Sequence, residues 1–286
     1  MGLFRKILIA VDDSEAGLNA LREGCRLGRG EKARMVAVTV APAYEGDLNL
    51  VGVRNLDRVI HEPSAAAVEA TKRIVGEEGV AVDHLVTTGD ISERITDVAV
   101  EYGCDLIVLG YERRPAVWRL LLNSVIPGVI ATSPSDVLVF PQESRFQWQS
   151  VLLAVNEPHS AVRPAQRALD FARAYGARLL IASPDIASKA MKPQQAHVSQ
   201  EGFQEWERGR FLAEFVQQAE DHHVLIQPVE LPGRLPAAAI RIAREQQVGL
   251  VILGWDLLKD HWSILGNRGA ALVIQRFSHP LLAVRT

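Results

Sequence analysis

The sequence predicts two tandem α/β domains, each a doubly wound, five-stranded parallel sheet, and three observations lead to this prediction. The length of 286 residues exceeds the roughly 100–200 residues of a typical single domain. Short runs rich in Val, Ile and Leu alternate with segments of helical period. Motifs of the first half recur 144 residues later, as 105–110 does at 249–254. We therefore expect domains at 1–142 and 150–286, joined by a polar linker at 143–149.

The elements of the first half follow from its apolar pattern. Nearly continuous apolar runs are typical of strands covered on both faces, and they predict strands at 6–11, 34–40, 81–87, 105–109 and 136–140. Segments of helical period between them predict helices at 14–28, about 62–78, 92–102 and 124–132. Asp90 or Ser92 can cap the third of these helices. Strand–helix alternation with right-handed crossovers makes the sheet parallel.

The second half repeats this order. Its apolar runs predict strands at 150–155, 178–182, 224–229, 249–253 and 280–284. Ligands of open parallel sheets bind at the carboxyl ends of the strands, near the point where the strand order reverses. That rule directs attention to Asp12, Val40, Gly89, Asp90 and Gly110 in the first half. The counterparts in the second half are Asn156, Ser183, Gly233 and Gly254.

Composition and charge exclude several classes of protein. With 48% hydrophobic and 23% charged residues, the chain is neither disordered nor fibrous. The formal net charge of −3 provides no global field that would attract nucleic acid or an anionic membrane surface. No apolar run reaches the roughly 18 residues of a membrane span, and the N-terminus does not read as a signal peptide. A cytoplasmic protein without nucleic-acid or membrane partners is expected.

Signatures of catalysis and metal binding are missing as well. The spacing of Cys25 and Cys104 matches neither a disulfide framework nor a metal motif. No Gly-x-Gly-x-x-Gly follows the first strand, and the chain contains neither Gly-x4-Gly-Lys-Ser/Thr nor Gly-x-Ser-x-Gly. We therefore assign no catalytic residue and no metal ligand, and enzymatic activity is not expected.

Several motifs together resemble the universal stress protein family. They are Val-Asp-Asp-Ser at 11–14, Gly89-Asp90, the run 105–110, Asn123-Ser124-Val125 and the apolar strand 136–139. The resemblance covers the chain once per half. It implies a Rossmann-like or flavodoxin-like fold for each half and a tandem, two-domain member. It also implies a stress-response protein that acts by binding and regulation.

The nucleotide-binding branch of this family carries Gly-x2-Gly-x9-Gly-Ser/Thr after the fourth strand. Such glycines let backbone N–H groups approach phosphates at a helix N-terminus. This pattern falls here on Gly110, Arg113, Asn123 and Ser124 in the first half. In the second half it falls on Gly254, Leu257, Asn267 and Arg268, and Asn156 stands where the first half has Asp12. Each half thus keeps one of the three glycines, and this departure from the family pattern argues against a phosphate-binding turn. The ligand that the resemblance implies is ATP or another adenine nucleotide, held by the first domain.

The resemblance also assigns roles to individual residues. Phosphates would lie at the helix that begins at Asn123-Ser124-Val125, with the Ser124 hydroxyl and the Arg113 charge against them. Val40 would line the base pocket, and Asp12 would hold the ribose or adenine side. In the alternative, Asn123 caps its own helix and Arg113 fills the pocket, which leaves a scaffold that acts through protein–protein interaction. A slow ATP hydrolase is the third hypothesis.

Assembly is the last expectation drawn from the family. Single-domain members pair through their fifth strands, whose edges would otherwise remain open to uncontrolled pairing. Matching apolar strands stand here at 136–140 and 280–284. An intramolecular pseudo-dimer is therefore expected, in which these two strands meet antiparallel. Association of whole chains into a homodimer is a further expectation with less support.

Overall fold

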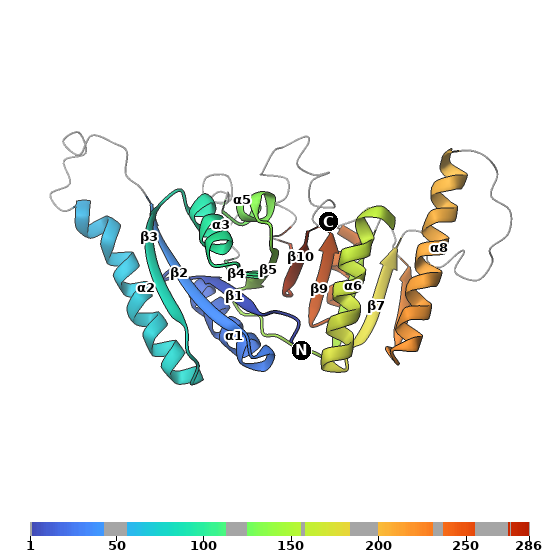
Figure 1. Ribbon diagram of the computed structural model, residues 1–286, viewed down its shortest axis with the longest axis horizontal. Coiled ribbons are helices and arrows are strands. Elements are labelled where there is room, and N and C mark those ends of the chain that lie inside the picture. The colour runs from blue at the N-terminus through green and yellow to red at the C-terminus, as the bar shows by residue number, and fades with distance from the viewer. Residues whose placement is uncertain are drawn as a thin grey trace. The chain divides into compact units, whose positions relative to one another are not determined.

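The chain forms two compact α/β units. The computed structural model describes residues 2–42, 56–112, 125–155, 158–183, 200–230, 237–254, 274 and 276–285. Unit 1 is Met1–Ser144 and unit 2 is Arg145–Thr286. The division falls inside the stretch expected to be a linker. Figure 1 shows the helices and strands of both units, each of which is described by itself below.

Unit 1 is a parallel sheet with helices on both faces, as the sequence predicts. Its strands lie in the order β3-β2-β1-β4-β5. In chain order its described elements are β1 (Lys6–Ala10), α1 (Glu15–Glu31), β2 (Arg34–Pro42), α2 (Leu56–Glu78), β3 (Asp83–Gly89), α3 (Ile91–Glu101), β4 (Leu106–Tyr111), α5 (Val125–Thr132) and β5 (Asp136–Pro141).

The bounds of most elements of unit 1 differ from the expected ones, most of all at α2, which begins at Leu56 and not near residue 62. Two of the differences have a physical reason in the contacts. β3 begins and ends two residues later than 81–87, because Asp83–Gly89 pairs residue by residue with 36–42 of β2. α1 continues beyond residue 28 to Glu31. It ends where Lys32 adopts φ 56°, and the Lys32 N–H then bonds the carbonyls of Gly28 and Arg29.

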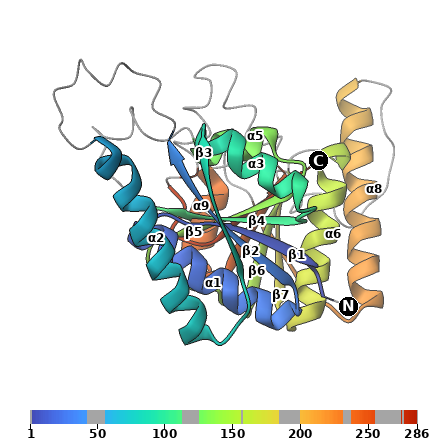
Figure 2. The same ribbon diagram turned by 60° about the vertical axis from the view of Figure 1, so that its left-hand side comes forward.

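The helices of unit 1 form two layers. α1 and α2 pack together on one face of the sheet, and α3 and α5 pack together on the other (Figures 1 and 2). Leu8 of β1 and Ile107 of β4 are fully buried between the layers. Burial on both faces is the reason why these strands read as continuous apolar runs.

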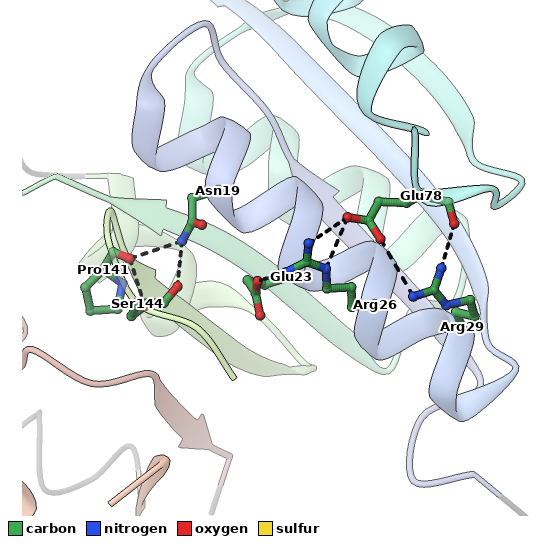
Figure 3. A network of polar contacts seen from close by, with 7 residues as sticks. All are labelled: Asn19, Glu23, Arg26, Arg29, Glu78, Pro141 and Ser144. Carbon is green, nitrogen blue, oxygen red and sulfur yellow. Dashed lines mark hydrogen bonds and ion pairs between the residues drawn. The ribbon is translucent and has the colours of Figure 1, made fainter. Parts of the chain in front are cut away.

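A polar network fastens the end of α2 to α1 (Figure 3). The Arg26 guanidinium donates from Nε to Glu78 Oε1 at 3.1 Å and contacts the buried Glu23 carboxylate at 2.7 Å. One turn on, Arg29 Nη1 donates to the Glu78 carbonyl at 2.7 Å. Glu78 is thus held through both its backbone and its side chain.

The opposite end of α1 holds the chain that leaves β5. Asn19 Nδ2 donates to the Ser144 carbonyl at 2.9 Å and to the Pro141 carbonyl at 3.3 Å (Figure 3). Glu15, one turn before Asn19 on α1, accepts a hydrogen bond from Gln142 Nε2 through its carboxylate. The last residues of unit 1 are therefore bound to the helix that follows its first strand.

Unit 2 has the same topology. Its strands lie in the order β10-β9-β6-β7-β8 and its described pairs are parallel. The described elements are β6 (Ser150–Ala154), α6 (Pro158–Tyr175), β7 (Arg178–Ser183), α8 (Gln200–Asp221), β8 (Ile226–Glu230), α9 (Ala237–Glu245), β9 (Leu250–Gly254) and β10 (Leu281–Val284). The repeat read from the sequence is therefore a repeat of structure.

Aromatic side chains anchor the start of unit 2 to α6. Trp148 stacks on Phe146 and on Tyr175, with ring centroids 4.0 and 3.6 Å apart. The fully buried Phe171 lies 6.2 Å from the Trp148 ring. These contacts belong to unit 2 alone, and the antiparallel pairing expected between 136–140 and 280–284 stays a prediction. Among the described helices, none is long and apolar enough to span a membrane.

Candidate functional site

The strand order of unit 1 reverses between β1 and β4, so their carboxyl ends are the expected position for a ligand. Asp12 follows β1, Val40 belongs to β2, and Gly110 lies near the end of β4. These three residues, chosen from the sequence, share one edge of the sheet.

Asp12 is exposed and held by the start of α1. Its Oδ1 accepts hydrogen bonds from the Ser14 backbone N–H at 3.2 Å and from Ser14 Oγ at 2.5 Å. Ser14 is the N-cap of α1, since its Oγ accepts from the Gly17 N–H at 3.0 Å. The sequence thus folds locally into a turn that presents a carboxylate beside a helix N-terminus, where negative charge is stabilised.

Gly17 packs closely against both Asp12 and Gly110. A Cβ at Gly17 would lie 2.1 Å from Asp12 Oδ1, and a Cβ at Gly110 would lie 2.6 Å from the Gly17 nitrogen and 2.3 Å from the Ala16 carbonyl oxygen. The first turn of α1 therefore packs directly on the end of β4. Gly17 is not among the residues predicted from the sequence, although a glycine three residues after an N-cap serine is a visible signal.

Gly110 therefore has a structural reason to be a glycine, besides the phosphate contact that the family resemblance implies. The carbonyl of the next residue, Tyr111, accepts from the Gln142 N–H at 2.9 Å. The end of β4 is fixed on one side by α1 and on the other by the chain that leaves β5.

The end of β1 is fastened to β2 behind Asp12. The Val11 N–H donates to the Val38 carbonyl at 2.9 Å, and the buried Thr39 hydroxyl donates to the Val11 carbonyl at 3.0 Å. Val40 follows in β2 with a half-buried side chain and pairs with Thr87 of β3. These bonds fix the spacing between the Asp12 and Val40 positions.

His84 of β3 extends this chain of hydrogen bonds. Its Nε2 lies 3.0 Å from Thr39 Oγ1. Since the Thr39 hydroxyl proton goes to the Val11 carbonyl, the bond requires the histidine to donate from Nε2. Burial, and secondarily the Lys72 charge, lowers the pKa of His84 from its ordinary value of 6.5.

This lowered pKa predicts a pH dependence of folding stability. The unfolded chain takes up the proton near pH 6.5, before the folded chain does, so His84 reduces the stability of unit 1 as the pH falls through that value toward the lower folded-state pKa. In His84→Gln this part of the dependence should vanish. Urea denaturation between about pH 7.5 and pH 5.5 measures it, and an identical pH profile in both proteins would contradict the assignment.

Gly89 and Asp90 open α3. Gly89 has φ 142°, which disfavours other residues. Asp90 is the N-cap, with its side chain accepting from the Glu93 N–H at 3.0 Å and from Ser92 Oγ at 2.7 Å. Of the two expected cap residues, Asp90 is thus the one that caps. The same bonds lower the pKa of its carboxyl group.

The other residues assigned from the sequence are only partly placed. Val125 is the first residue of α5, one residue later than the expected start of that helix. Arg113, Asn123 and Ser124 lie outside the described residues, as do Asn156, Gly233, Leu257, Asn267 and Arg268 of the second half. Gly254 ends β9.

The described residues offer little for nucleophilic or metal chemistry. Burial raises the pKa of the Cys25 thiol to about 12 and that of the Cys104 thiol to about 11, so both stay protonated at neutral pH. The part of the chain that the structure describes contains no group of three or more His, Cys, Asp and Glu side chains able to hold a metal ion. What this edge offers a ligand is hydrogen bonding and charge.

Comparisons with known proteins agree with the sequence motifs. The model of the universal stress protein family matches residues 3–141, nearly all of unit 1. A universal stress protein of Methanocaldococcus jannaschii is 28% identical over an alignment of 145 residues, and the match covers 48% of this chain and 82% of the relative. One from Synechocystis is 26% identical over 149 residues, covering 48% of this chain and 97% of the relative.

The fold of the whole chain also has a solved counterpart. The crystal structure of a universal stress protein from Archaeoglobus fulgidus aligns with a TM-score of 0.66 at 15% identity. The alignment covers 98% of this chain and 96% of that one. At this identity the likeness concerns the fold.

Proposed function

Because this chain belongs to the universal stress protein family through residues 3–141, we propose that it is a regulatory binding protein whose unit 1 takes ATP or another adenine nucleotide. The observation that supports the proposal most is the arrangement of residues at the carboxyl ends of β1 and β4. There the exposed Asp12 carboxylate, the first turn of α1 and Gly110 pack together at the reversal of strand order.

In this proposal the ligand follows the edge of the sheet. Asp12 accepts a hydrogen bond from the ribose or adenine side, and Val40 lies under the base. The phosphates extend toward the start of α5, where Asn123, Ser124 and Val125 meet them with backbone N–H groups and the serine hydroxyl. Arg113 adds a positive charge.

Unit 1 is proposed as the only nucleotide site. Asn156 in place of Asp12 and Arg268 in place of Ser124 remove a carboxylate and a hydroxyl from the second half. The proposal therefore includes a stoichiometry of one nucleotide per chain. The cytoplasm as location, and the pairing of the two halves as a pseudo-dimer, belong to the same proposal.

Asp12→Asn tests the proposal, because it gives unit 1 the residue found at the matching position of unit 2. An asparagine still accepts the hydrogen bond from the Ser14 N–H, so α1 keeps its start. Losing the charge-assisted bond should weaken ATP binding by about tenfold or more. Titration calorimetry of the full-length chain measures the affinity and the stoichiometry.

Asp13→Asn is the matched control. Asp13 is the exposed neighbour and loses the same charge, and we expect its ATP affinity to stay within about twofold of the parent protein. Equal weakening in both variants would remove the role given to Asp12. A parent protein that binds no adenine nucleotide would overturn the proposal in favour of a scaffold that acts through protein–protein interaction.

A further inference from the structure

We propose that Arg94 of α3 is a specificity-determining residue that contacts the base of the nucleotide, an inference that rests on the function proposed above. The position follows from strand order. The carboxyl ends of β3, β2, β1 and β4 stand in a row, with neighbouring strands about 4.8 Å apart. A nucleotide with its sugar at Asp12 and its phosphates beyond β4 has its base at β2 and β3.

Arg94 is held beside β3, at the end of this row of strands where the base is proposed to lie. Its guanidinium donates from Nε and Nη2 to Thr87 Oγ1 at 3.2 and 3.0 Å. Thr87 is the direct partner of Val40 in the parallel pair β2–β3, and neighbouring residues of parallel strands present their side chains on the same face. The guanidinium therefore lies on the face of the sheet to which Val40 points.

The turn between β3 and α3 is shaped around this arginine. A Cβ at Gly89 would lie 2.8 Å from Arg94 Cγ and 3.1 Å from Cδ, so the missing side chain leaves the space that the arginine stem occupies. From the other side, Asp97 Oδ2 accepts from Arg94 Nη1 at 3.0 Å. Thr87, Gly89 and Asp97 together fix the guanidinium.

The chemistry of the fixed group suits a base. A guanidinium has five N–H donors and no acceptor. Three of them make the bonds to Thr87 and Asp97, which leaves two N–H groups on the terminal nitrogens without a partner among the described residues. Purine rings carry acceptor nitrogens on their edges. The phosphates lie at the other end of the row, beyond β4, so Arg94 contributes to recognition of the base.

Arg94→Gln tests this inference, because glutamine keeps the aliphatic stem beside Gly89 and removes the charged fork. We expect the variant to bind both ATP and adenosine about tenfold more weakly than the parent chain, by the same factor, and to bind tripolyphosphate with unchanged affinity. Calorimetry and competition titrations on the full-length chain measure all three ligands. Arg73→Gln, with the same charge change in an exposed ion pair to Glu77 on α2, should leave all three affinities unchanged.

The remaining outcomes overturn the inference in distinguishable ways. If the variant bound ATP and tripolyphosphate more weakly and adenosine with unchanged affinity, Arg94 would be a phosphate contact. An equal loss for all three ligands would indicate a purely structural role. Unchanged ATP and adenosine affinities would refute the Arg94 contact and leave the proposed function standing. A parent chain that binds neither ATP nor adenosine would overturn both.

Discussion

Gly110→Val is expected to destabilise unit 1 by about 3 kcal/mol, because the new side chain has no space. Its Cβ would lie 2.3 Å from the Ala16 carbonyl oxygen and 2.6 Å from the Gly17 nitrogen, and both atoms belong to the backbone of α1. Neither can move without displacing the first turn of the helix and with it the Ser14 cap. The protection of β1 and β4 amides against hydrogen exchange measures the effect in unit 1 directly.

Gly30→Ala is the matched control for this prediction. Gly30 belongs to α1, and a Cβ there would meet nothing within 4 Å. Replacing a glycine inside a helix with alanine should stabilise unit 1 by about 0.5–1 kcal/mol, the opposite sign. If the β1 and β4 amides of Gly110→Val exchanged as slowly as those of the parent protein, this result would contradict the close packing of β4 on α1.

Phe171→Ala is expected to destabilise unit 2 by about 3–5 kcal/mol. The Phe171 side chain is 0% exposed, and its ring lies 6.4 Å from Phe146, 6.2 Å from Trp148 and 5.9 Å from Tyr175. Its removal leaves a cavity among these rings, beneath the segment that begins unit 2. Hydrogen exchange of the β6 and β7 amides measures the loss.

Val162→Ala provides the comparison on the same helix. Val162 of α6 is 58% exposed, so truncating its side chain should change the stability by no more than about 0.5 kcal/mol. Similar effects of the two variants would contradict the placement of Phe171 in the core.

Much of the fold could be predicted from the sequence because the signals are local. A strand covered on both faces needs a continuous apolar run, and the buried residues 7–9 of β1, 106–109 of β4 and 137–140 of β5 form such runs. Ser14 precedes a segment of helical period and caps it. Asp12, Val40 and Gly110 could be selected because parallel strands bring their carboxyl ends to one edge.

Other features depend on residues far apart in the chain. The exact span of β3 could not be read from its own residues, since pairing with β2 extends it to Gly89. The segment 143–149 reads as a polar linker, and yet Phe146 and Trp148 stack against α6. Local polarity does not reveal which distant side chains a segment will meet.

Gly110 shows which properties follow from the sequence alone and which depend on the tertiary structure. By itself the sequence determined that a glycine follows the apolar run of the fourth strand in each half, and that an aspartate follows the first strand only in the first half. Only the tertiary structure decided that Gly110 meets Ala16 and Gly17, because this contact depends on how closely α1 packs on β4. Hydrophobic period specifies which face of an element is buried, whereas the distance between two packed elements is set by the side chains of both.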